Sequence, residues 1–243
     1  MRDIGEAFGL AAALIVGLDP DLLEIVGLSL RVSLAAVGVA CLVGLPLGAL
    51  LAVARFPGRG AVLVAVNALL GLPPVVVGLL VYLQLSRSGP FGFLGLLYTP
   101  TAMIVAQVVL IAPIVVALSR QALEERHDEY AEQFRSWCLT RRQTVLALIV
   151  DARLALLTVA LAGFGRAIAE VGAVIVVGGN IDHLTRVMTT AIALETSKGN
   201  LALALALGIV LLAIALAVNA ALALAGAATD RAATATALAP ARG

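Results

Sequence analysis

Charged residues gather in one stretch of this chain, residues 120–153, whereas the segments on either side are long, apolar and almost free of charge. Hydrophobic residues make up 62% of the chain and charged residues 13%, and the mean hydropathy is +1.08. Soluble domains are about 45–50% apolar and about 25% charged. We therefore predict an all-α integral membrane protein whose charged stretch faces water.

The apolar segments predict five membrane spans, because a helix needs about 20 apolar residues to cross a bilayer. We expect these spans at about 28–54, 61–85, 100–119, 154–177 and 201–226, within a transmembrane domain that covers residues 19–226. Asp19 and Pro20 are typical of a helix start and mark the beginning of the first long helix. Residues 1–18 are too short to span and are expected to lie in the membrane interface, and residues 227–243 are expected to form a disordered tail.

Two features inside the spans indicate a translocation path. Pro73 and Pro74 interrupt the second span, and such a break is tolerated at bilayer depth only where protein or a wet cavity satisfies the freed carbonyls. Arg166 and Glu170 lie four residues apart in the fourth span, where a single charge would cost about 2.5–3.5 kcal/mol. A packing kink at the prolines and a structural ion pair between the two charges are the alternatives.

Within the charged stretch, the spacing of Tyr130, Phe134, Trp137 and Cys138 favours one face of a short helix. We expect this helix to begin near Asp128 and to end in a tight turn near Cys138. Its apolar side would pack against the bundle, which is typical of a docking element. A solvated loop with a chance apolar stripe is the alternative.

A second helix is expected directly after this turn. Thr140 and Gln143 form the pattern T-x-x-Q ahead of an apolar run, which predicts a capping box. The charged stretch therefore reads as a short helix, a turn, and a new helix from about Arg141.

The arginines predict the orientation in the membrane. One side of the expected spans holds Arg55, Arg59, Arg120, Arg126, Arg135, Arg141, Arg142, Arg153, Arg231 and Arg242, and the other holds Arg2, Arg87, Arg186 and Lys198. Because positive charge accumulates in cytoplasmic loops, we expect an N-terminus outside the cell membrane and a cytoplasmic C-terminus. A partner of residues 120–153 would then be cytoplasmic.

Several function classes have no support in the sequence. There is no G-x-x-x-x-G-K-[ST] phosphate loop and no cluster typical of a catalytic site, so we do not expect an enzyme. Two cysteines and two histidines far apart predict no metal site. The net charge of +1 argues against nucleic acid as a partner.

Residues 132–151 resemble the cytoplasmic coupling motif of binding-protein-dependent ABC transporter permeases, E-A-A-x3-G-x9-I-x-L-P. Glu132, Gln133 and Phe134 take the place of E-A-A, and Cys138 takes the place of the glycine. That replacement matters, because a left-handed conformation costs a non-glycine residue about 1 kcal/mol. The segments LSLRVSLAA, GLPPVVVGLLVYLQLSRSGPFGFLGLLYTP and GFGRAIAEVGAVIVVGGN are similar to oxyanion importers, most closely to the tungstate-type permeases. The resemblance covers about residues 19–226.

The resemblance implies an importer built from two copies of this chain, two cytoplasmic ABC ATPase subunits and an extracytoplasmic substrate-binding protein. ATP and Mg²⁺ would bind to the ATPase, and this chain would need no cofactor. The residues implied in ATPase coupling are Glu132, Gln133, Phe134, Arg135, Trp137, Cys138, Arg141 and Arg142. The residues assigned to the translocation path or gate are Pro73, Pro74, Gly78, Arg166, Glu170, Gly178, Gly179 and Asn180.

Other classes of membrane protein stay open. A secondary transporter would need inverted repeats and ion-coupling carboxylates, yet five spans do not divide into halves and Glu170 is the one carboxylate deep in a span. A channel or structural subunit would need no cytoplasmic docking helix. Within the ABC class, tungstate is the expected substrate and molybdate is the next candidate.

Overall fold

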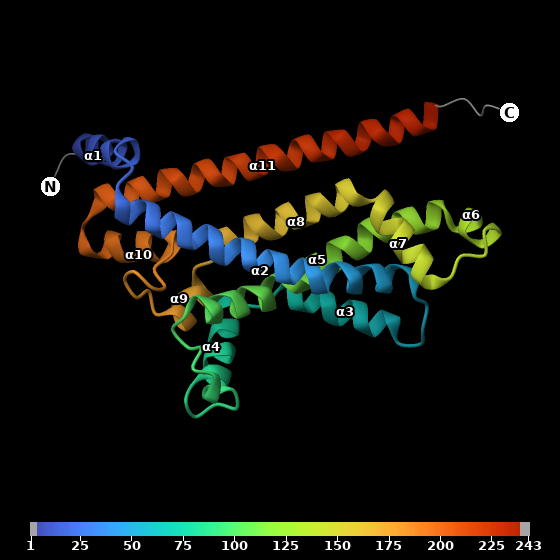
Figure 1. Ribbon diagram of the computed structural model, residues 1–243, viewed down its shortest axis with the longest axis horizontal. Helices are drawn as coiled ribbons and strands as arrows, with labels where there is room; N and C mark the ends of the chain where they lie inside the picture. Colours follow the sequence, from blue (N-terminus) through green and yellow to red (C-terminus); the bar gives the residue numbers. More distant parts are fainter. Residues whose placement is uncertain (1–3, 239–243) are drawn as a thin grey trace.

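The computed structural model describes the backbone of residues 4–238 and the side chains of residues 5–224. Within this range the chain forms α-helices and one 3-10 turn, η1 (Gly92–Leu94), and no strand (Figure 1). The helices are α1 (Ile4–Val16), α2 (Pro20–Val53), α3 (Arg59–Leu70), α4 (Pro74–Leu85), α5 (Pro100–Glu129), α6 (Ala131–Ser136), α7 (Arg141–Asp151), α8 (Arg153–Ile168), α9 (Gly172–Gly178), α10 (Met188–Lys198) and α11 (Leu201–Leu238).

Three helices are long and apolar enough to cross a bilayer, namely α2, α5 and residues 201–224 of α11. Two further pairs pass the same test together but are sharply bent, α3 with α4 by 99° and α7 with α8 by 74°. The described chain therefore has three candidate spans, or up to five if each bent pair crosses once. The expected total of five holds in the second case.

Among the described helices, α2 and α5 share the most extensive contact, and they run alongside each other (Figure 1). Gly44 and Gly48 on α2 allow the close approach, because a Cβ on Gly48 would lie 2.0 Å from the Ser119 Oγ of α5. Small residues four apart are a usual means of packing membrane helices. α8 packs on both α2 and α5, α11 packs on α8 and α10, and α4 projects from the bundle while contacting α9.

Local signals explain where the long helices begin and where the second span breaks. The Asp19 carboxylate accepts hydrogen bonds from the backbone N–H groups of Asp21 and Leu22, both at 3.1 Å, and caps α2. Thr99 caps α5 ahead of Pro100. The expected break at Pro73 and Pro74 is present, since α3 ends at Leu70 and Pro74 begins α4.

Three expected boundaries are wrong. Asp128 and Glu129 do not start a helix but end α5, which continues from the apolar segment through strong helix formers such as Gln, Leu, Glu and Arg. Residues 154–177 are not one helix, because the chain breaks between Ile168 and Gly172 and places Glu170 in the break. Residues 227–238, expected to be disordered, continue α11 as an alanine-rich helix, and residues 239–243 lie outside the described range.

α1 adopts the helical form expected for the N-terminal segment and packs against α11 through the buried Ala7 and Ala11. Residues 1–3 lie outside the described range. The position of α1 in the membrane interface stays a prediction.

Candidate functional site

The predicted turn after the short helix α6 is present. Cys138 adopts a left-handed backbone with φ 52°. Around it, the Leu139 N–H donates to the Phe134 carbonyl at 3.2 Å and the Cys138 N–H donates to the Arg135 carbonyl at 3.1 Å. This pattern resembles a Schellman ending, in which glycine normally takes the left-handed position. Cys138 therefore takes the backbone position that glycine normally occupies at such a helix end.

The predicted capping box of α7 is also present. The Gln143 side-chain oxygen accepts from the Thr140 N–H at 2.9 Å, and the Thr140 hydroxyl accepts from the Gln143 N–H at 3.4 Å. α7 begins at Arg141 as expected. Local hydrogen bonds therefore define both the end of α6 and the start of α7.

The expected apolar face of α6 is divided between two environments. Phe134 is half-buried, packs against the cluster around Leu123 and Leu148, and has Tyr130 edge-on with ring centres 5.9 Å apart. Trp137 is 66% exposed, and Cys138 is exposed as well. Phe134 therefore anchors α6 to its own bundle, whereas Trp137 faces outward. The stripe expected to pack against the bundle is correct for Phe134 and wrong for Trp137 and Cys138.

A hollow of about 760 Å³, here called the α6 hollow, opens between the ends of α2 and α5 and the α6 to α7 segment. Its lining residues are Val53, Arg55, His127, Asp128, Ala131, Phe134, Arg135, Cys138, Leu139, Arg141 and Thr144. Of the eight expected coupling residues, Phe134, Arg135, Cys138 and Arg141 meet there. Glu132, Gln133 and Trp137 are exposed on α6 and the turn, and Arg142 lines a different groove with Arg141.

A charged cluster that the sequence did not indicate joins α2, α3 and α5. The Glu124 carboxylate of α5 pairs with Arg59 at 2.6 Å and also with Arg120. The Arg59 Nε donates to the Leu51 carbonyl of α2 at 3.0 Å. Arg120 and Glu124 are four residues apart, a spacing that indicates a helical pair, but Arg59 offered no local signal. The cluster ties the start of α3 to α5 and to the end of α2.

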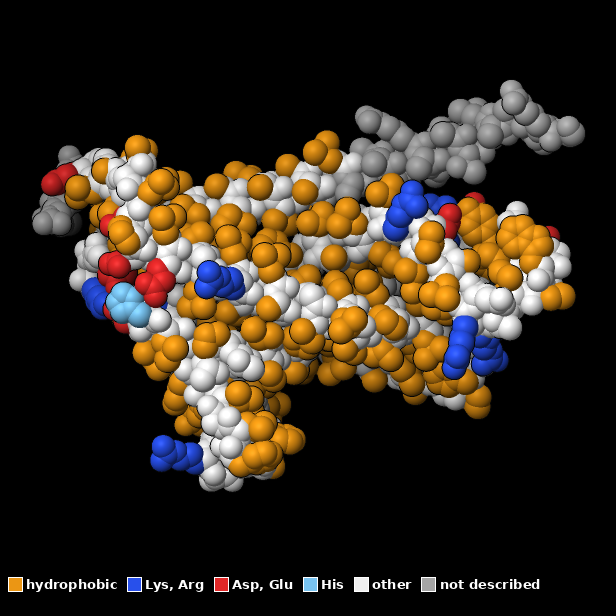
Figure 2. Space-filling view, viewed as in Figure 1, with side chains coloured by type: hydrophobic (Ala, Val, Ile, Leu, Met, Phe, Trp, Pro, Cys, Tyr) orange, Lys and Arg blue, Asp and Glu red, His pale blue; other side chains and the backbone are white. Residues whose placement is uncertain are grey.

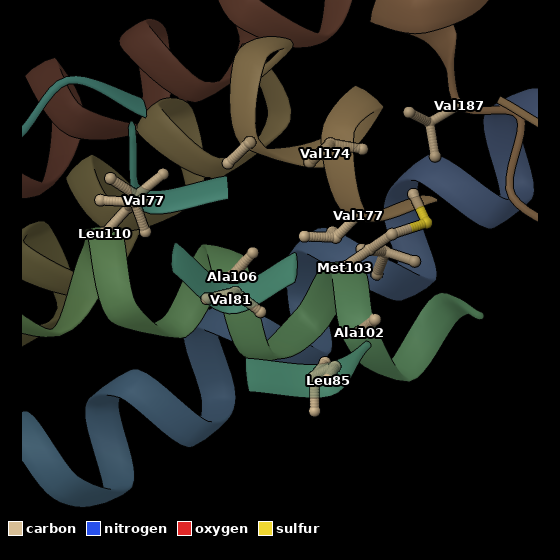
Figure 3. Close-up of a cluster of buried hydrophobic side chains, with 12 residues drawn as sticks. Val77, Val81, Leu85, Ala102, Met103, Ala106, Leu110, Val174, Val177 and Val187 are labelled. Atoms are coloured by element: carbon tan, nitrogen blue, oxygen red, sulfur yellow. The ribbon is translucent and has the colours of Figure 1, made fainter. Parts of the chain in front are cut away.

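The expected gate residues lie at the other end of the bundle, around α4 and α9 (Figure 1). Gly78 of α4 is buried against α9, and a Cβ there would lie 2.8 Å from the Ala173 Cα. Figure 3 shows the cluster that surrounds this contact, in which Val77 and Val81 of α4, Met103 of α5 and Val177 of α9 are labelled. The Pro73 side chain is exposed beside the break, so it does not belong to this packed layer.

Arg166 and Glu170 meet, as their spacing predicted. The Arg166 Nη1 hydrogen-bonds the Glu170 Oε2, and the side chains are 36% and 4% exposed. The Glu170 Oε1 also accepts from the Ala173 N–H of α9 at 3.1 Å, and the Glu170 backbone carbonyl accepts from the Thr189 hydroxyl of α10 at 2.9 Å. Glu170 therefore links α8, α9 and α10 at the break that the sequence did not predict.

The segment after α9 is fixed by short-range hydrogen bonds. Gly179 and Asn180 both take positive φ, 71° and 51°. The Thr185 hydroxyl donates to the Gly178 carbonyl at 2.6 Å, and the Thr190 hydroxyl donates to the Asn180 Oδ1 at 2.8 Å. These bonds hold Gly178, Gly179 and Asn180 in a defined loop between α9 and α10. This loop and the α6 hollow lie at opposite ends of the bundle (Figure 1).

Comparisons with known proteins agree with this architecture. Residues 44–230 match the family model for the binding-protein-dependent transport system inner membrane component. The tungstate uptake system permease TupB of Peptoclostridium acidaminophilum is 40% identical over 82% of this chain and 88% of its own. The molybdenum transport system permease ModB of Azotobacter vinelandii is 34% identical over 62% of this chain and 70% of its own.

A solved structure confirms the expected fold. A chain of a bacterial ABC transporter involved in the import of the acidic polysaccharide alginate superposes with a TM-score of 0.63 and 22% identity, covering 95% of this chain and 90% of that one. The all-α arrangement of broken and long helices is thus that of an ABC importer permease. With the family match over most of its length, this chain belongs to the inner membrane components of binding-protein-dependent transport systems.

Proposed function

We propose that this chain is the permease of an ATP-driven importer that carries an oxyanion, with tungstate as the substrate and molybdate as the next candidate. The similarity to TupB supports the substrate class. Two copies of the chain would work with two cytoplasmic ATPase subunits, which bind ATP and Mg²⁺, and with an extracytoplasmic binding protein. The N-terminus would lie outside and the C-terminus in the cytoplasm, as the arginine distribution indicates.

One observation carries this proposal, namely the exposed surface of α6 and its turn. Glu132, Gln133 and Arg135 are exposed on α6, and Trp137 is 66% exposed at its end. An exposed tryptophan with charged neighbours is typical of an interface centre, where aromatic anchors contribute most of the binding energy. Because Phe134 holds α6 to the bundle, a force on this surface would reach the spans.

The gate would consist of the contact between α4 and α9 and the loop that follows α9. Gly78 brings the α4 backbone onto Ala173, and the residues from Gly178 to Asn180 close the end of α9. Arg166 and Glu170 would serve this gate as a structural pair rather than as an anion site, because Glu170 already has bonding partners on both carboxylate oxygens.

Co-purification tests the coupling surface. The full chain would be purified from its native membrane in mild detergent as wild type, as Glu132→Arg/Arg135→Glu, and as Arg87→Glu, a control in the loop at the α4 end. We expect an ATPase subunit with the wild type and the control, and its loss with the double variant. A correctly inserted double variant that keeps its ATPase would refute the coupling role of α6. A wild type with no ATPase partner would refute the importer.

The substrate would be tested on the recovered complex in liposomes with its own binding protein. We expect tungstate to stimulate ATP hydrolysis more strongly than molybdate or sulfate. Stimulation by molybdate alone would make molybdate the substrate, and stimulation by none of the three would refute an oxyanion importer.

A further inference from the structure

An apolar groove of about 420 Å³, here called the arginine groove, lies between the last turns of α2 and the first turns of α7. Its walls are Pro46, Leu50, Val53 and Ala54 from α2 and its end, and Val145 and Leu146 from α7, with Arg141 and Arg142 completing the lining. The groove thus combines a hydrocarbon surface with two cationic groups.

No side-chain contact within the described part of the chain accounts for the positions of Arg141 and Arg142. Both are exposed, and neither forms an ion pair or a side-chain hydrogen bond with any residue whose side chain is described. They occupy the first turn of α7, where the helix dipole disfavours positive charge and favours an anion. An anion bound there would neutralise both guanidinium groups and interact favourably with the helix end.

The apolar side chains around the groove favour a membrane setting over an aqueous one. Arg142, Leu146 and Val150 follow each other at four-residue intervals on one face of α7, and Leu146 and Val150 are 63% and 62% exposed. Leu50 on the facing side of the groove is 51% exposed. Such a face, with cations at one end and hydrocarbon along the rest, is typical of a helix in the membrane interface.

The position along the chain fits the inner edge of the bilayer. α2 is a candidate span that ends at Val53, and α7 is the first half of a bent apolar pair that continues into α8. Figure 2 shows apolar side chains over most of the visible face, with charged side chains collected toward its ends. With α2 as a span, the arginine groove would open near the end of that span, where hydrocarbon gives way to headgroups.

We propose that the arginine groove binds an anionic phospholipid, with its phosphate on Arg141 and Arg142 and an acyl chain along Leu50, Val53 and Leu146. Basic pockets beside membrane helices on the cytoplasmic side bind such headgroups. A free inorganic anion would use the arginines but leave the apolar walls in water. A phospholipid matches both parts of the groove. Through it, α7 is fixed to the membrane surface while α6 remains available to a partner.

Native mass spectrometry of the purified full chain tests the site, after incubation with phosphatidylglycerol or with phosphatidylcholine. We expect the wild type to retain phosphatidylglycerol preferentially. Arg141→Gln/Arg142→Gln is expected to lower its retention by on the order of tenfold, because each basic residue near anionic lipid contributes severalfold. Arg153→Gln, which removes an exposed arginine outside the groove, is the matched control and is expected to bind as the wild type does.

Two further experiments distinguish binding of a whole phospholipid from binding of a phosphate group alone. Leu50→Trp keeps both arginines and fills the apolar part, so it should also lose the lipid. Added inorganic phosphate should not displace phosphatidylglycerol from the wild type. Retention by the double variant, retention by Leu50→Trp, or displacement by phosphate would each overturn the proposal. Loss of the lipid when an ATPase subunit is bound would assign the arginines to that partner instead. These results do not depend on transport, so they can fail independently of the proposed function.

Discussion

Glu170 offers the sharpest test of how the gate is held. Its carboxylate is 4% exposed, pairs with the 36% exposed Arg166, and accepts a hydrogen bond from the Ala173 N–H at the start of α9. Removing one partner of a fully buried pair costs about 3–5 kcal/mol. Because Arg166 is only partly buried, we expect about 2 kcal/mol for Glu170→Gln, which removes the charge and keeps the capping oxygen. Glu170→Ala also removes the cap and should cost about 1 kcal/mol more.

Removing Arg166 instead of Glu170 tests which partner of the ion pair contributes more to the stability of the fold. Arg166→Gln leaves the more deeply buried charge without its partner, so it should destabilise the fold more than Glu170→Gln, by about 3 kcal/mol or more. The double variant Arg166→Gln/Glu170→Gln should recover part of this loss, which a double-mutant cycle measures. The unfolding free energy would be followed in bicelles by SDS titration, with far-UV circular dichroism as the signal.

Two outcomes would refute this reasoning. Equal stability of Glu170→Gln and Glu170→Ala would show that the cap on α9 contributes nothing. A Glu170→Gln protein as stable as the wild type that no longer transports would give the carboxylate a role with the substrate rather than in the fold. Glu195→Gln, which removes a similarly buried carboxylate paired with Lys198 in α10, is a control for the general effect of losing a buried acid.

Three other predictions use the same preparations. Cys138→Gly should stabilise the protein by about 1 kcal/mol, because glycine takes a φ of 52° without strain, and loss of ATPase coupling in an assembled complex would contradict the match to the family motif. Gly78→Ala should destabilise by about 1–3 kcal/mol, because its Cβ would meet the Ala173 backbone, and an unchanged unfolding curve would contradict that contact. The hydrogen bond that the His183 Nδ1 donates to the Glu24 carboxylate at 2.9 Å raises the pKa of the exposed His183, so the pair is complete below the ordinary histidine pKa and weakens as pH rises through the raised one. An NMR titration of the imidazole should show that Glu24→Gln lowers this pKa, and no change would exclude the pair.

Features with a strong local cause could be predicted from the sequence. Pro73 and Pro74 cannot continue a helix, so the break before α4 followed from backbone chemistry alone. The T-x-x-Q pattern at Thr140 satisfies its own backbone N–H groups, so the start of α7 needed no tertiary information. The turn near Cys138 followed from the apolar spacing of the short helix and from the new helix start directly after it, although the cysteine itself gives no turn signal.

One missed feature depends on helix propensity beyond the apolar segment, and the others depend on contacts between distant segments. The end of α5 was placed where polarity changes, but a helix of good formers continues into water, so Asp128 was assigned to the wrong end of a helix. Glu170 is not a preferred capping residue, and its cap on α9 is stabilised by Arg166 and Thr189 from the neighbouring helices. Glu124 and Arg59 are 65 positions apart, and no pattern in either segment points to the other.

α5 is the element that joins the two ends of this molecule. It is one helix from its Thr99 cap, beside the proposed gate, to Glu129 at the α6 hollow. In the half of α5 that begins at Thr99, the Gln107 side chain donates to the Ala167 carbonyl at 3.1 Å, directly before the break between α8 and α9. A continuous helix moves as a rigid element, whereas a break can absorb a change in backbone angles. A displacement of α6 would therefore reach the gate along α5 and be taken up at residues 169–171, where the bonds of Glu170 determine how freely α9 moves.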